Sequence, residues 1–196
     1  LVQGLFAEAG PLAVPVAAFA LGGYGRFELC LHSDIDLLVL FADPIGAQEE
    51  RFLGRFLNPL WDLGLTVGHH VREIHEGPGD DANNPEFLLA LTDARPVAGD
   101  ATVLERFLAQ ADVAATHART LDSLRTLVSA RHARFNGTIY QQEPDVKESP
   151  GGLRDLFGAY TIAKLTDPAL LQQGGAGARA LGDAEEFLMR VRAVLQ

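Results

Sequence analysis

The strongest constraint on the fold of this 196-residue chain is a pair of short apolar runs separated by a glycine-rich, charged stretch. Residues 16–21 are apolar, residues 35–41 are apolar except for Asp36, and both runs have the length of buried strands. The stretch between them begins with Gly-Gly-Tyr-Gly-Arg at residues 22–26 and leads to two acids one residue apart, Asp34 and Asp36. We therefore predict two buried strands that meet a loop, with the glycines and the acids at that junction.

The two acids predict a metal site. Side chains alternate faces along a strand, so Asp34 and Asp36 share one face while Ile35 points to the other. Neighbouring carboxylates repel each other unless a cation lies between them, and oxygen ligands of this kind suit Mg²⁺. An Asp-x-Asp at a strand start can also be a solvated edge, which is the plainer interpretation of the pair taken alone.

The glycine-rich turn predicts a phosphate site. Gly22 and Gly23 allow close approach of the backbone N–H groups to an anion, Arg26 supplies charge and Ser33 supplies a hydroxyl donor. Gly-Gly between strands is more often a simple turn. The combination of the turn with the acid pair, at this spacing, favours the binding of a metal and a triphosphate.

The chain resembles the nucleotidyltransferase domain of the bacterial PII uridylyltransferases, enzymes that modify the nitrogen-signalling protein PII. Residues 146–156, with the sequence Val-Lys-Glu-Ser-Pro-Gly-Gly-Leu-Arg-Asp-Leu, are the most discriminating part of the resemblance. The other similar segments are residues 22–29, 32–38, 59–65, 67–72, 91–100 and 187–192.

The resemblance implies a fold and an activity. The fold is α+β, a mixed sheet with helices of the polymerase β type followed by a helical subdomain. The activity is the Mg²⁺-dependent transfer of UMP from UTP to a tyrosine hydroxyl of PII, with release of pyrophosphate. Asp34 and Asp36 are then the catalytic, metal-binding residues. The nucleotide-binding residues are Gly22, Gly23, Arg26, Ser33, Lys147, Gly151, Gly152 and Arg154.

The sequence departs from the family pattern at two places. Family members usually have glycine where this chain has Phe27, which adds bulk beside the phosphate loop. The wider superfamily takes a third carboxylate from a later strand, but residues 65–74 contain no Asp. We name His69 as a candidate third metal ligand, although a histidine on such a strand is more often a packing residue.

Two alternatives remain open, and a third, a purely structural interaction domain, would leave the Asp34 and Asp36 pair unexplained. A glutamine-synthetase adenylyltransferase shares the Gly-Gly and Asp-x-Asp motifs, although the Val-Gly-His-His-Val-Arg run at residues 67–72 favours the PII-modifying branch. A nucleotide-binding regulatory module without catalytic activity is also compatible with the missing third Asp.

Two domains are expected. Residues 1–77 read as the catalytic core, with a helix over residues 47–63, and residues 78–196 as a mostly helical substrate- and nucleotide-binding region. A polar loop at residues 76–85 separates them. Further helices are expected at residues 85–91, 102–110, 113–135, 153–165 and 183–196.

Composition limits the partners and the location. A formal net charge of −10 argues against nonspecific nucleic-acid binding, which relies on clustered positive charge. No signal peptide or membrane span is recognisable, so we expect a cytoplasmic enzyme. The sequence starts at Leu1 and stops within an apparent helix, which we interpret as a fragment of a longer enzyme.

Overall fold

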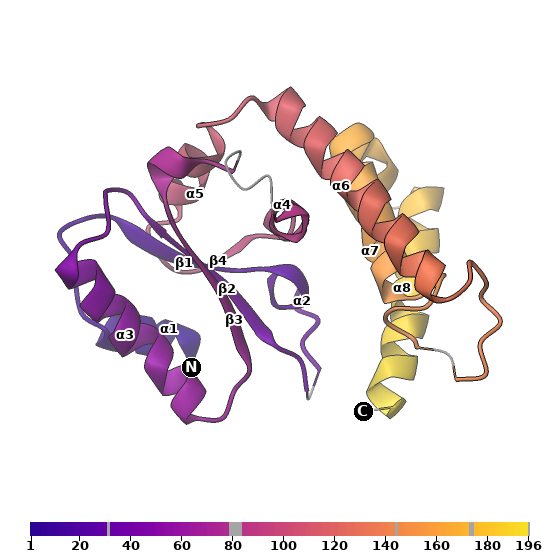
Figure 1. Ribbon diagram of the computed structural model, residues 1–196, viewed down its shortest axis with the longest axis horizontal. Helices are drawn as coiled ribbons and strands as arrows, with labels where there is room; N and C mark the ends of the chain where they lie inside the picture. The colour runs from indigo at the N-terminus through magenta and orange to yellow at the C-terminus, as the bar shows by residue number, and fades with distance from the viewer. Residues whose placement is uncertain (31, 79–83, 144, 173–174, 196) are drawn as a thin grey trace. The chain divides into compact units, whose positions relative to one another are not determined.

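The structure is a computed structural model that describes residues 1–30, 32–78, 84–143, 145–172 and 175–195 (Figure 1). The chain forms two compact units, Leu1–Thr116 and His117–Gln196. Each unit is described by itself. Part of the loop expected at residues 76–85 lies outside the described residues.

The first unit is a four-stranded sheet with helices on both faces (Figure 1). Its elements are α1 (Val2–Glu8), β1 (Val16–Ala20), α2 (Gly22–Gly25), β2 (Ile35–Phe41), α3 (Ala47–Asp62), β3 (Val67–Glu73), the 3₁₀ turn η1 (Ile74–Glu76), α4 (Pro85–Leu91), β4 (Arg95–Gly99) and α5 (Thr102–Leu108).

The sheet is mixed, with strand order β3-β2-β1-β4. β1 pairs antiparallel with β2 and with β4, whereas β2 and β3 are parallel and connected through α3. The predicted α+β fold with a mixed sheet is confirmed, and both apolar runs form neighbouring strands at its centre.

Alternation along β2 divides the core of this unit into two layers. Leu37, Val39 and Phe41 pack with α1 and α3, where the rings of Phe52 and Phe56 fill the layer. On the opposite face Leu38 and Leu40 pack with residues of α4, α5 and η1. Side chains at odd-numbered positions of β2 therefore face α1 and α3, and those at even-numbered positions face α4 and α5.

The compact units divide later than the predicted boundary at Gly77. The reason is β4, which we did not expect: we predicted a mostly helical region after residue 77. β4 extends the sheet by pairing with β1, with Ala17 opposite Gly99 and Ala20 opposite Arg95. This pairing places residues 95–99 in the first unit, although Pro96 and Gly99 make the segment a poor strand by composition.

The second unit is helical. It contains most of α6 (Val113–Arg134), followed by α7 (Leu153–Thr166), the 3₁₀ turn η2 (Pro168–Leu171) and α8 (Ala176–Leu195). Gly158 of α7 allows close packing against Leu124 of α6, because a Cβ at this glycine would lie 3.3 Å from Leu124 Cδ1. α8 begins earlier than the residue 183 start that we predicted.

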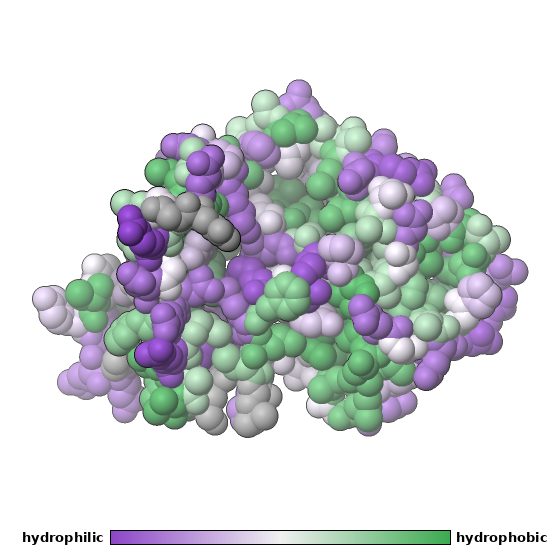
Figure 2. Space-filling view, turned by 180° about the vertical axis from the view of Figure 1, so that it is seen from behind, coloured by the Kyte–Doolittle hydropathy of each residue, from purple (hydrophilic) through white to green (hydrophobic). Residues whose placement is uncertain are grey.

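Apolar side chains also reach the surface, and green areas interrupt the hydrophilic ones on the face shown in Figure 2. Among the most exposed are Phe27, Tyr140 and Val194. In the described part of the chain, no helix is both long and apolar enough to cross a membrane.

Candidate active site

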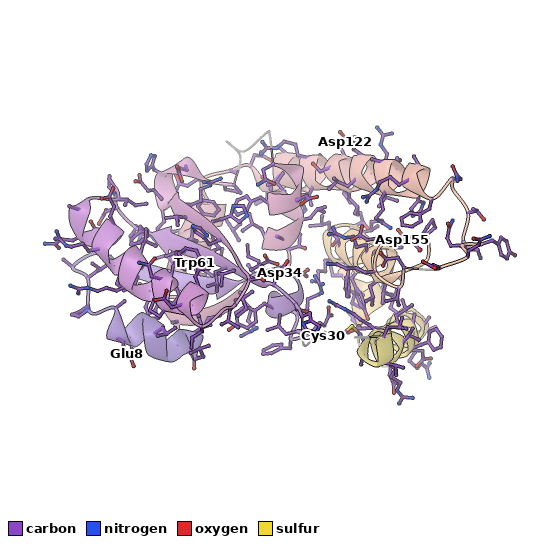
Figure 3. The ribbon with its side chains drawn as sticks, turned by 60° about the horizontal axis from the view of Figure 1, so that its bottom comes forward. Glu8, Cys30, Asp34, Trp61, Asp122 and Asp155 are labelled. Atoms are coloured by element: carbon purple, nitrogen blue, oxygen red, sulfur yellow. The ribbon has the colours of Figure 1, made fainter. Side chains whose placement is uncertain are left out.

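Asp36 is the centre of the candidate site. It is half-buried in β2, and its even position directs it to the sheet face that carries Leu38. Asp34 precedes the strand by one residue and is exposed, next to α2 at the end of the sheet (Figure 3). Because Asp34 lies outside β2, the expectation that strand alternation puts the two carboxylates on one face stays a prediction.

Two glycines flank the Asp36 carboxylate. In the parallel pairing of β2 with β3, Gly68 is the residue opposite Asp36. A Cβ added to Gly68 would lie 2.5 Å from Asp36 Oδ1, and one added to Gly22 would lie 3.6 Å from Asp36 Oδ2. The first distance is far below van der Waals contact, so only glycine at position 68 leaves the carboxylate where it is.

Gly68 is a site residue that the sequence reasoning did not select. A glycine inside a strand often marks a place where another group approaches closely. That signal was available in the run of residues 67–72, but the partner was not, because it depends on the strand register.

The turn that contains α2 follows β1 directly. Gly22 has φ +51°, a conformation that disfavours other residues, and Gly23 has no atom within 4 Å of an added Cβ. A Cβ at Gly25 would lie 2.2 Å from the carbonyl oxygen of Asp93. The turn therefore packs closely on the α4–β4 connection, and Gly23 faces open space.

Arg26 forms ion pairs with two carboxylates of the protein. Its Nε lies 2.8 Å from Glu28 Oε2, and its Nη1 forms an ion pair with Asp93 Oδ2. We expected this guanidinium to face a phosphate. Because two carboxylates already balance its charge, a phosphate would have to displace one of them.

Arg95 is a second basic residue at the turn, and the sequence reasoning missed it. From the start of β4 it donates hydrogen bonds to the carbonyl oxygens of Gly25 (3.1 Å) and Tyr24 (3.0 Å). Carbonyl groups at a helix end lack partners within the helix, so Arg95 satisfies the end of α2. No local pattern shows this contact, which joins residues about 70 positions apart.

Ser33 organises the loop before β2. Its Oγ accepts a hydrogen bond of 2.9 Å from the Cys30 N–H, and its own N–H donates to the Cys30 carbonyl oxygen. The predicted donor to a nucleotide thus has a structural contact within its own turn.

The structure does not bring His69, the candidate third metal ligand, to the acid pair. His69 pairs with Leu37 in the β2–β3 register and so lies on the α1/α3 face, opposite to Asp36. Its ring packs edge-on against Trp61 of α3, with centroids 5.4 Å apart (Trp61 in Figure 3). His70 is on the face of Asp36 and packs against Phe87, at 4.7 Å between centroids. Within the described residues, no group of three His, Cys, Asp or Glu side chains is arranged to hold a metal.

The four remaining predicted nucleotide ligands lie in the second unit. Lys147 and Gly151 are exposed, Gly152 is buried, and the Arg154 Nε donates to Glu148 Oε1 at 2.5 Å. A Cβ at Gly152 would lie 2.7 Å from the Val146 carbonyl oxygen, so this glycine is required by the turn itself.

Asp155 is the most connected carboxylate of this turn (Figure 3). It accepts hydrogen bonds from Arg131 Nη2 and from the Gly151 N–H, each at 2.6 Å, and its Oδ2 lies 2.8 Å from His132 Nε2. Burial raises the pKa of the Asp155 carboxyl, but hydrogen bonds from Arg131, Gly151 and His132 outweigh that effect and hold the pKa below its usual value.

Arg131, which is buried on α6, also donates to the Glu148 carbonyl oxygen at 3.2 Å. The conspicuous motif at residues 146–156 thus joins α6 to α7. A surface charge pair between Arg154 and Asp155 is the plainer alternative that the sequence allows for this motif, and the structure instead pairs Arg154 with Glu148 and Asp155 with Arg131.

Comparisons with known proteins agree with the motifs. A family model described as GlnD PII-uridylyltransferase matches residues 117–196, the same residues as the second compact unit. The bifunctional uridylyltransferase/uridylyl-removing enzymes of Burkholderia mallei (strain ATCC 23344) and Burkholderia pseudomallei (strain 668) are each 38% identical over 164 residues, which is 83% of this chain and 19% of theirs.

A solved structure described as "Crystal structure of the toxin-antitoxin with AMP-PNP" covers 70% of this chain and 94% of its own, with 17% identity. Its TM-score of 0.35 is too low to support an argument about fold or activity. The chain spans about a fifth of the length of the curated relatives, and its matches to them confirm the resemblance to the PII uridylyltransferases seen in the motifs.

Proposed function

We propose that this chain carries the nucleotidyl-transfer site of a PII-modifying enzyme, which transfers UMP from UTP to a tyrosine hydroxyl of PII. The observation that carries the proposal is the Asp36 carboxylate, for which Gly68 and Gly22 leave room beside the α2 turn. The relatives named uridylyltransferase/uridylyl-removing enzyme support this choice of reaction.

The donor set suits magnesium. Asp36 is half-buried and Asp34 is exposed, and two carboxylates are a common protein contribution to an Mg²⁺ site that also takes substrate phosphates and water. When bound there, Mg²⁺ would offset negative charge on the triphosphate. Asp34 and Asp36 are the residues that would hold it.

The chain's own groups then position the substrates. Gly23 faces open space, so the backbone N–H groups of the glycine turn can approach the triphosphate. The acceptor hydroxyl oxygen forms a bond to the α-phosphorus, the bond from that phosphorus to the bridging oxygen breaks, and pyrophosphate leaves. The hydroxyl proton passes to solvent.

The test is transfer of labelled UMP to purified PII by the 196-residue chain in the presence of Mg²⁺. Asp36→Asn keeps the size of the side chain and removes its charge, so we expect transfer to fall by roughly 10²–10³ or more. Circular dichroism checks that the variant is folded. A folded Asp36→Asn protein with full activity would exclude the assignment.

A second candidate is a module that binds nucleotide without transferring it. One observation favours it: among the described residues, no group of three His, Cys, Asp or Glu side chains is arranged to hold a metal ion. Release of pyrophosphate separates the two candidates, since binding alone produces none.

A further inference from the structure

Phe27 combines two features that are unfavourable for a folded protein. Its φ is +65°, and Asn136 is the other described non-glycine residue with positive φ. This conformation is unfavourable for a bulky side chain. The Phe27 side chain is also 77% exposed, so no packing in the core offsets the strain. Strained residues of this kind concentrate at ligand sites.

The Phe27 ring is nevertheless held in place from one side. The guanidinium carbon of Arg95 lies 3.8 Å from the ring centroid, a cation–π contact. Arg95 is itself fixed by its hydrogen bonds to the Tyr24 and Gly25 carbonyl oxygens. Arg95 therefore holds one face of the Phe27 ring, and the backbone of α2 holds Arg95. The high exposure of Phe27 leaves the other face of the ring open to solvent.

The ring belongs to the turn that borders the candidate site. α2 begins at Gly22, where an added Cβ would lie 3.6 Å from Asp36 Oδ2. Phe27 is the second residue after α2, which ends at Gly25. The four residues of α2 rise about 6 Å along the helix axis, so Gly22 and Phe27 lie at opposite ends of one short turn.

We propose that Phe27, supported by Arg95, is the platform on which the base of the nucleoside triphosphate stacks. The proposal rests on the proposed function, because it places the phosphates at α2 and the acid pair. An aromatic platform accepts any base, since every base has a π-face. Phe27 thus supplies affinity for the nucleoside part of the ligand without strong preference between uracil and adenine.

The experiment compares two ligands by calorimetry on the full chain with Mg²⁺: UTP and inorganic tripolyphosphate. Phe27→Leu keeps an apolar side chain and removes the ring. We expect its dissociation constant for UTP to rise roughly 5- to 150-fold, and that for tripolyphosphate, which has no base, to stay unchanged. Tyr140→Leu, which removes another exposed ring in the second unit, should leave both constants unchanged.

Phe27→Trp provides a measurement that does not depend on loss of function. In a Trp61→Phe background the new indole is the single tryptophan of the chain, since the sequence contains one. Stacking predicts quenching of its fluorescence by UTP and ATP but not by tripolyphosphate.

The outcomes separate the two proposals. Equal affinity of wild type and Phe27→Leu for UTP, with no base-dependent quenching, overturns the platform and leaves the proposed function standing. Wild-type protein that binds neither UTP nor tripolyphosphate overturns both.

Discussion

Gly68→Ala tests whether the space opposite Asp36 is required for transfer. The added Cβ would lie 2.5 Å from Asp36 Oδ1, and ordinary contact begins at about 3.4 Å. The carboxylate, or the strand that carries it, would have to move by about 0.9 Å. A displacement of roughly 1 Å in a positioned group costs on the order of 10²-fold in rate, so we expect about that loss of UMP transfer.

The stability of the variant should change much less than its activity. Alanine in a strand is favoured over glycine by about 0.5–1 kcal/mol, while overpacking costs about 1–3 kcal/mol. These contributions oppose each other. We expect the free energy of unfolding, from urea denaturation, to change by no more than about 2 kcal/mol.

Gly54→Ala is the matched control. This glycine lies in α3, and an added Cβ would meet Asn58 Nδ2 at 3.8 Å, an ordinary contact. Its transfer rate should equal that of the wild type. In an Asp36→Asn background, Gly68→Ala should cause little further loss, because both changes act on one carboxylate. A Gly68→Ala protein that retains transfer within about threefold of wild type would refute the reasoning.

Three further predictions concern the stability of the two units. Asp155→Ala should lower the free energy of unfolding by roughly 2–4 kcal/mol, because it leaves the buried Arg131 without its carboxylate. Asp122→Ala, which removes an exposed ion pair with Arg125, should lower it by less than about 0.5 kcal/mol. Equal effects of the two changes in urea denaturation would contradict this prediction. Because the pKa of Asp155 is lowered in the folded state, its contribution is fully present above the unfolded pKa of about 3.9 and is lost as the pH falls through the folded pKa. The stability difference between wild type and Asp155→Asn should therefore be present at pH 5 and shrink below pH 4, and a difference that grows as the pH falls below 4 would be inconsistent with this linkage. Phe56→Ala should lower the free energy of unfolding by about 3–5 kcal/mol, since this fully buried ring makes an edge contact with Phe6. Phe187 is 65% exposed on α8, so Phe187→Ala should lower the free energy of unfolding by less than about 1 kcal/mol. Similar thermal midpoints for the two variants would show that packing between α1 and α3 contributes little to stability.

The central strands and most helices were predictable from local patterns. The apolar runs at residues 16–21 and 35–41 became β1 and β2, and α4 has the predicted bounds of Pro85–Leu91. The apolar side chains of β1 and β2 determine that these segments form buried strands, and capping residues determine where α4 begins. Asn84, for example, caps α4 by accepting a hydrogen bond from the Phe87 N–H.

β4 was not predictable because its own residues do not favour a strand. Residues 95–99, Arg-Pro-Val-Ala-Gly, form a strand since β1 has a pairing edge available to them. Tertiary pairing here outweighs the local preference.

The faces of His69 and His70 depend on register. Both histidines lie on a strand that was predicted correctly, but a shift of one residue exchanges the two faces. The register that pairs Asp36 with Gly68 puts His69 on the opposite face, where its ring packs against Trp61. The pairing of Arg26 with Asp93 could not be predicted either, because 67 positions separate the two residues in the sequence.

The turn around α2 is held by three long-range contacts: Gly25 against the Asp93 carbonyl, Arg26 with Asp93, and Arg95 with the end of the helix. These contacts restrict the backbone before any ligand arrives, so the conformational entropy of the turn is lost during folding and not during binding. The heat-capacity change of nucleotide binding should then reflect only the apolar surface that the ligand covers. The amide protons of Gly25 and Arg26 should likewise exchange with solvent as slowly as those of the sheet, and not at the rate of a loop.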